Sequence, residues 1–239
     1  MPSTIVLVHG AFAESASWDR VLSTLLSAGR HHRVIAAANP LRGLAADARA
    51  VSDLVRTVDG PVLLVGHSYG GSVISNVDAD AGDITGLVYV AGFAPEAGES
   101  AITLSSMLPG STLADALAAV PRSDGTTDLT IKADRFHDQF AADVPAPRAA
   151  RMAATQRPVT QEALAEPAGA RPLWKELPSW FVFGEEDRSL PAAVQHHMAK
   201  RARARRTIEI PGASHAVLVS HPVATALLIL EAASLRVPA

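Results

Sequence analysis

The chain has 239 residues, of which 48% are hydrophobic and 19% charged, so it is long and apolar enough to fold as one domain around a buried core. This composition excludes a disordered chain, and the net charge of −3 argues against a general nucleic-acid binder. The sequence holds no cysteine, which excludes disulfide bonds, thiolate metal sites and cysteine nucleophiles.

The start of the chain lacks the basic and apolar regions of a signal peptide, because residues 1–3 lead directly into an apolar run. The most apolar stretch, residues 223–235, contains Thr225 and Glu231 and is shorter than the ~20 residues that cross a bilayer. We therefore expect a cytoplasmic protein that has no membrane partner.

Short apolar runs alternate with longer segments of helical periodicity along most of the chain. Most of these runs are continuously apolar, as expected for parallel strands covered by helices on both faces. The predicted strands are residues 4–8, 33–37, 62–65, 86–90, 180–183 and 207–210. The predicted helices are residues 18–28, 45–58, 69–79, 192–201 and 217–235. This repetition predicts an α/β fold with a doubly wound, mostly parallel sheet.

One long segment, about residues 96–178, interrupts the alternation. It is rich in alanine, proline and leucine, and its prolines divide it into short helices without a strand of the kind found elsewhere. We expect a single domain over residues 1–239, with a core of residues 1–95 and 179–239 and a helical cap insertion. Because the insertion follows the end of a strand, it is expected to be a lid over a site. A helical layer that only extends the core is the alternative.

A pentapeptide, Gly66-His67-Ser68-Tyr69-Gly70, follows the buried run of residues 62–65 and opens a predicted helix. A strand that ends in Gly-x-Ser-x-Gly before a helix places the serine on a sharp, strained turn, with its hydroxyl raised above the sheet edge. The two glycines allow strand and helix to approach closely. The pattern predicts Ser68 as a nucleophile; a chance match, in which the serine only forms a turn, is the alternative.

Polar residues also follow three other predicted strands. They are His9-Gly10-Ala11 after the first, Gly184-Glu185-Glu186-Asp187 after the penultimate and Ser214-His215 beyond the last. Because ligands bind at the carboxyl ends of strands in open α/β sheets, we expect these groups to converge at one edge. Their order along the chain is serine, acid, histidine.

This order and the strained serine turn resemble the α/β-hydrolase superfamily over essentially the full chain. The sequence is most similar to small, cap-bearing bacterial hydrolases related to plant methyl esterases and hydroxynitrile lyases. The matching stretches are residues 5–12 with Trp18, 65–71, 88–95, 184–187 and 213–217. The resemblance implies an acyl-transfer enzyme that needs no cofactor and no metal.

The expected roles follow from chemistry and from the resemblance together. Ser68 needs a base within hydrogen-bond reach, and His215 is the candidate. A buried carboxylate would fix the histidine tautomer, and the resemblance favours Asp187 over its neighbours Glu185 and Glu186. His221 is a rival base, but it precedes a proline inside a predicted helix and is expected to be structural.

The tetrahedral intermediate needs fixed hydrogen-bond donors. The resemblance assigns these to the backbone N–H groups of Ala11 and Tyr69. His9 and His67 flank the site and are expected to orient loops. The adjacent pair His196-His197 is expected at the surface, because neighbours on a regular element do not share a face.

The serine excludes dehalogenase and epoxide hydrolase chemistry, which needs a carboxylate nucleophile. The related hydroxynitrile lyases carry threonine where Gly10 stands and lysine where Ala216 stands, so cyanohydrin cleavage is not expected here. Hydrolysis of a carboxylic ester through an acyl-enzyme is the expected reaction. An amidase, thioesterase, lactonase, cofactor-free lyase or oxygenase, or a ligand receptor on the same scaffold, are the alternatives.

The substrate pocket is expected to be apolar, with no basic cluster to hold a carboxylate or phosphate. Its expected lining residues are Phe12, Trp18, Phe93, Phe136, Phe140, Met152, Leu190 and Val217. This lining predicts a small, mainly uncharged ester as the substrate. A monomer or a homodimer is expected, and the sequence does not decide between them.

Overall fold

The core of the protein is a six-stranded parallel sheet. The computed structural model describes residues 3–28 and 32–234. The strands are β1 (Thr4–Val8), β2 (Arg33–Ala37), β3 (Pro61–His67), β4 (Asp83–Val90), β8 (Ser179–Gly184) and β9 (Arg206–Ile210). They lie in the order β2-β1-β3-β4-β8-β9, and every neighbouring pair is parallel. The predicted α/β, doubly wound fold is confirmed.

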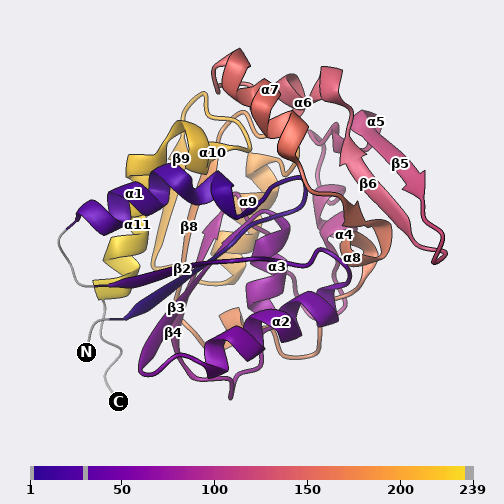
Figure 1. The fold of residues 1–239 in the computed structure, drawn as a ribbon. Coiled ribbons are helices and arrows are strands. Elements are labelled where there is room, and N and C mark those ends of the chain that lie inside the picture. Colours follow the sequence, from indigo (N-terminus) through magenta and orange to yellow (C-terminus); the bar gives the residue numbers. More distant parts are fainter. Residues whose placement is uncertain (1–2, 29–31, 235–239) are drawn as a thin grey trace.

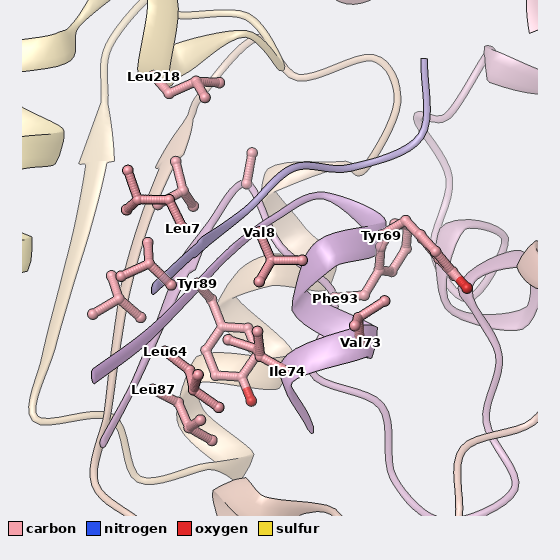
Figure 2. Close-up of a cluster of buried hydrophobic side chains, with 14 of the residues drawn as sticks. Leu7, Val8, Leu64, Tyr69, Val73, Ile74, Leu87, Tyr89, Phe93 and Leu218 are labelled. Atoms are coloured by element: carbon pink, nitrogen blue, oxygen red, sulfur yellow. The ribbon is translucent and has the colours of Figure 1, made fainter. Parts of the chain in front are cut away.

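Helices cover both faces of this sheet (Figure 1). On one face α11 (Pro222–Ser234) packs on β3, β4 and β8 and against α1 (Asp19–Ser27), which follows the 3₁₀ turn η1 (Ser15–Trp18). On the other face lie α2 (Leu44–Arg56), α3 (Tyr69–Ser75) and α9 (Ala192–Arg201). Figure 2 shows side chains of α3, such as Val73 and Ile74, filling the space beside the strands. Burial on both faces explains the apolar sequences of the inner strands β1, β3, β4 and β8, whereas the edge strands β2 and β9 are more exposed.

The C-terminal helix is divided, which corrects the expectation of one helix over residues 217–235. A short helix, α10 (Val217–Ser220), ends at His221, and α11 begins at Pro222. Proline has no backbone N–H and disfavours helical geometry in the residue before it, so the chain turns at this point. Residue 235 lies outside the described residues.

The expectation that residues 96–178 form helices only is wrong. Besides α4 (Ala101–Ser105), α5 (Leu113–Ala116), α6 (Ala133–Phe140), α7 (Ala146–Thr155), α8 (Gln161–Ala165) and η2 (Leu173–Lys175), they contain three strands. These are β5 (Leu117–Pro121), β6 (Thr127–Ile131) and β7 (Val159–Thr160), in one antiparallel sheet. Gly125, with φ of +86°, lies in the turn between β5 and β6. Glycine adopts this left-handed conformation without strain, and the hairpin forms around it.

The insertion lies over the carboxyl ends of the core strands (Figure 1) and is fastened there by polar contacts. Arg201 of α9 binds both carboxylate oxygens of Glu99 at 2.8 Å. Arg42 donates to Asp128 of β6 at 2.6 Å, and the backbone N–H of Thr160 donates to the carbonyl of Leu41. In the described part of the chain, the helices are all too short or too polar to pass through a membrane.

Candidate active site

Ser68 sits on a strained turn between β3 and α3. Its φ of 53° and ψ of −125° are unfavourable for a residue with a side chain. A Cβ on Gly66 would lie 2.4 Å from the carbonyl oxygen of Gly70, and a Cβ on Gly70 would lie 2.4 Å from that of Val8. Only glycine fits at both positions, so the motif is required by the close approach of helix and strands.

The Ser68 hydroxyl is the first member of a chain of three buried side chains. Its Oγ lies 2.8 Å from Nε2 of His215, whose Nδ1 lies 2.7 Å from Oδ2 of Asp187. None of the three residues is more than 6% exposed. Residues from the ends of β3, β8 and β9 are thus brought into hydrogen-bond contact, as the sequence order predicts.

Further donors hold the Asp187 carboxylate in place. Its Oδ1 accepts the backbone N–H groups of Ser189 and Leu190, both at 2.8 Å. Its Oδ2 accepts the side-chain amide of Gln195 at 3.0 Å in addition to His215. Because both oxygens face donors, the carboxylate has one orientation toward the histidine.

The alternative acids and the rival base lie elsewhere. Glu185 and Glu186 are exposed, and Glu185 accepts the backbone N–H of Gly212. His221 contacts Ser220 and lies 3.5 Å from Asp143. Of these groups, only His215 contacts the Ser68 hydroxyl, and only Asp187 contacts His215.

Helix α6 of the insertion holds the two loops that carry the acid and the histidine. The side-chain amide of Gln139 donates to the carbonyl of Arg188, next to Asp187. The carbonyl of the following residue, Phe140, accepts the backbone N–H of Ala216, next to His215. The Phe140 ring also lies edge-on to the His215 ring at 4.9 Å. One turn of helix therefore contacts both loops.

His67 lies directly behind His215, with ring centroids 5.1 Å apart. Its Nε2 lies 3.2 Å from the carbonyl oxygen of His215, to which it donates in the neutral ring. Complete burial lowers the pKa of His67 well below 6.5, and the neighbouring His215 lowers it further. A neutral ring behind His215 can support its loop without repelling a positive charge on it.

His9 contacts the loop that holds Ala11. Its Nδ1 lies 2.9 Å from the carbonyl oxygen of Gly10, and its Nε2 accepts the backbone N–H of Asn39. Burial lowers the pKa of His9 from 6.5 to about 4, so the ring is neutral at physiological pH. The Gly10 carbonyl belongs to the same peptide unit as the Ala11 N–H, so this hydrogen bond fixes the orientation of that N–H.

Tyr69 is anchored by its hydroxyl, which donates to Oδ2 of Asp47 at 2.8 Å. Figure 2 shows this hydroxyl pointing away from the side chains of Val8 and Val73. Burial raises the pKa of Asp47, and burial together with the nearby Asp47 raises the pKa of Tyr69. The hydrogen bond between Tyr69 and Asp47 connects the start of α3 to the start of α2.

A cavity of about 510 Å³ opens beside Ser68. Ala11, Tyr69 and Ser68 lie in its wall, and the residues that surround them are mostly apolar. No charged residue lines this cavity in the described ranges. Its lining is Ala11, Phe12, Ser68, Tyr69, Phe93, Ala101, Ile102, Ser105, Ser106, Leu108, Pro109, Gly110, Ser111, Leu113, Ala114, Leu117, Leu129 and Leu164.

Comparison with known proteins decides the family. The sequence profile described as the alpha/beta hydrolase family matches residues 5–226. This chain belongs to the α/β-hydrolase family. The hydrolase is 27% identical over 237 residues to a pyrethroid hydrolase of Sphingobium wenxiniae, covering 91% of this chain and 83% of the relative. The family resemblance expected from the sequence is confirmed.

Two further comparisons agree with this family: one covers part of the sequence, and the other covers the fold. The hydrolase is 36% identical over 115 residues to a carbendazim hydrolyzing esterase of a Nocardioides species, covering 43% of this chain and 47% of the relative. Its fold matches the crystal structure of polyneuridine aldehyde esterase with a TM-score of 0.79, at 19% identity, covering 97% and 99% of the two chains.

Six of the eight residues predicted to line the pocket of this hydrolase lie outside the cavity beside Ser68. Phe12 and Phe93 are in the wall. Trp18 is fully buried against His67, Phe136 packs on Phe140, and Phe140 packs on His215. Leu190 and Val217 are buried beside Asp187 and His215, and Met152 lines a second cavity. These six are apolar residues of the core or of the loops, which sequence alone does not distinguish from a pocket wall.

Most of the residues that line the cavity carry no recognisable signal in the sequence. Residues 101–117 supply eleven of its lining residues, from α4 to the start of β5. Gln139 and Gln195, which hold the acid and its loop, also carry no motif. In the described part of the chain, no cluster of three or more metal-ligating side chains occurs.

Proposed function

We propose that this hydrolase cleaves small, mainly uncharged carboxylic esters through an acyl-enzyme on Ser68. The observation that carries the proposal is the chain of contacts from the Ser68 hydroxyl through the His215 ring to Asp187. A serine hydroxyl is a weak nucleophile at neutral pH and needs an adjacent base that is itself held in one orientation.

In the first half of the reaction, Oγ of Ser68 attacks the ester carbonyl carbon while Nε2 of His215 takes the hydroxyl proton. Asp187 keeps the other ring proton on Nδ1 and stabilises the positive ring. His215 then delivers the proton from Nε2 to the departing alkoxide, and the C–O bond to the alcohol breaks. The acyl group remains on Ser68.

In the second half, a water molecule gives a proton to Nε2 of His215 and attacks the acyl carbon. The bond from that carbon to Oγ of Ser68 breaks, and Oγ recovers the proton from His215. A carboxylic acid leaves, and the enzyme returns to its starting state without a cofactor.

The negative oxygen of each tetrahedral intermediate would be bound by the N–H groups of Ala11 and Tyr69. Both residues line the cavity beside Ser68, and the Tyr69 N–H is free of the helix ladder because it opens α3. The His9 hydrogen bond to Gly10 supports the Ala11 donor. Loss of one such donor typically costs ~3–4 kcal/mol of transition-state stabilisation.

The substrate class is inferred from the cavity. Its walls are mostly apolar and carry no charge among the described residues, so a charged acyl group would lose hydration there without gaining a partner. The relatives named as a pyrethroid hydrolase and a carbendazim hydrolyzing esterase support a small organic molecule with a hydrolysable bond.

The test compares Ser68→Ala with wild type on a panel of 4-nitrophenyl esters. Wild type should turn over neutral butyryl and benzoyl esters faster than the anionic hemisuccinyl ester. Ser68→Ala should lose at least roughly 10⁴-fold in kcat/KM, because the hydroxyl that forms the acyl-enzyme is gone. An organophosphonate should transfer one phosphonyl group to wild type, with loss of its leaving group, and should not modify this variant.

Ser72→Ala is the matched control, since Ser72 is a buried serine of α3, the helix that follows Ser68, and its hydroxyl has no hydrogen-bond partner among the described residues. It should keep wild-type turnover. Absence of ester turnover in wild type would instead favour a ligand receptor, and fastest turnover of the hemisuccinyl ester would reject the proposed substrate class.

A further inference from the structure

A second cavity, of about 470 Å³, shares the lining residue Phe12 with the catalytic one. Phe12 lines both cavities and follows Ala11 directly, whereas Ser68 lines only the first. The second cavity lies between the segment that leads into α1 and helix α7 of the insertion. Neither the proposed reaction nor the family match assigns a role to it.

Three arginines face this cavity: Arg20 from α1, and Arg148 and Arg151 from α7. Their guanidinium groups form neither an ion pair nor a hydrogen bond with any other described residue. Arg148 is half-buried, and its pKa is lowered by burial and next by the charge of Arg20. Arginine groups that lie close together without partners favour an anion between them.

The other residues of the wall are acidic or apolar, and they determine the net charge of the cavity and the kind of ligand it could hold. Glu14 and Asp19 also line the cavity, so three positive charges face two negative ones, in a chain of net charge −3. Asp19 partly offsets the repulsion that Arg148 experiences. Phe12, Met152 and Val219 add apolar surface. The cavity thus combines an excess positive charge with an apolar wall, whereas the catalytic cavity carries no charge among its described lining residues.

We propose that the second cavity binds a small organic carboxylate with an apolar body. The carboxylate would be held by the guanidinium groups of Arg148 and Arg151, whose planar donors match two carboxylate oxygens. The apolar body would pack on Phe12 and Met152. This site is independent of the proposed esterase reaction, because none of its residues is a member of the Ser68 relay.

The experiment uses Ser68→Ala protein, so that ester turnover plays no part, with ¹³C-labelled methionine methyl groups. Met152 lines the second cavity, Met107 lies between two residues of the catalytic cavity wall, and Met198 is fully buried in the core. Benzoate should shift the Met152 signal in a saturable way and leave those of Met107 and Met198 in place. Benzamide, its uncharged counterpart, should bind at least roughly tenfold more weakly, because it lacks the charge-assisted contacts.

Replacement of the two arginines identifies the charge that matters. The double variant Arg148→Gln/Arg151→Gln should weaken benzoate binding by about tenfold or more. Arg49→Gln, which removes an exposed arginine of α2 outside the cavity, should leave binding unchanged. The proposal is overturned if benzoate shifts Met107 but not Met152, if benzamide binds equally well, or if the control weakens binding as much as the double variant. Equal binding of inorganic phosphate would also reject it, since phosphate has no apolar body.

Discussion

Exchange of the carboxylate of the proposed triad for an amide, Asp187→Asn, tests the proposed mechanism most directly. Oδ1 of Asp187 accepts two backbone N–H groups, so the amide oxygen of asparagine will take this position. The amide NH₂ must then face Nδ1 of His215, where Oδ2 lies 2.7 Å away in wild type. An NH₂ group only donates, so Nδ1 becomes the acceptor and the ring proton moves to Nε2. Nε2 then faces Ser68 with a proton and cannot accept another.

The expected loss is about 10⁴-fold in kcat, as for the same exchange in another serine hydrolase triad. This corresponds to roughly 5–6 kcal/mol of transition-state stabilisation. Loss of one hydrogen bond to the Asp187 carboxylate should lower kcat less than loss of the carboxylate itself. Gln195→Leu removes a 3.0 Å donor from Asp187 but keeps the carboxylate beside His215, so we expect only about tenfold loss.

The assay measures kcat on 4-nitrophenyl butyrate for both variants, with melting temperature and far-UV circular dichroism as checks on folding. Residual activity of Asp187→Asn should rise at alkaline pH, where hydroxide replaces the base. A folded Asp187→Asn enzyme that stays within tenfold of wild type would refute the tautomer argument. An equal loss in Gln195→Leu would instead indicate that packing around the acid, rather than its charge, sets the rate.

Three further outcomes are expected from neighbouring contacts. Gly10→Ala should lower both activity and melting temperature, because the new Cβ would lie 2.6 Å from Cβ of Ser68; unchanged turnover would contradict this. Tyr69→Phe should destabilise the fold by ~1–3 kcal/mol in urea unfolding, since the buried Asp47 loses a donor. His9 has a pKa of about 4 in the folded protein, below its ordinary 6.5. Between pH 4 and 6.5 the unfolded chain therefore binds more protons than the folded protein. Stability should therefore fall by up to about 3 kcal/mol as pH drops from 6.5 to 4, and His9→Gln should lose this part of the pH dependence.

The contacts of the proposed triad could be anticipated from sequence because each member follows a strand of the parallel sheet. A parallel sheet brings the carboxyl ends of its strands to one edge, so Ser68, Asp187 and His215 are placed together by topology alone. The strain at Ser68 and the close packing at Gly66 and Gly70 also follow from the local pattern.

The insertion was harder to anticipate because its structure depends on partners distant in sequence. Strand β5 is rich in alanine and ends in Pro121, which are weak signals for a strand. Asp124-Gly125 in the turn was the one local sign of a hairpin. The arginine cluster of the second cavity also gave no signal in the sequence, because Arg20 and Arg148 are far apart along the chain and meet only in the fold.

Helix α6 sets a limit on how substrate can enter. Gln139 and Phe140 contact the loops beside Asp187 and His215. An outward movement of the whole insertion would therefore separate Asp187 and His215 from each other and from Ser68. Entry is therefore expected on the side of α4, where Ile102 and Leu108 are both cavity wall and partly exposed surface. Deleting the insertion to make a smaller enzyme would remove contacts that position the proposed triad.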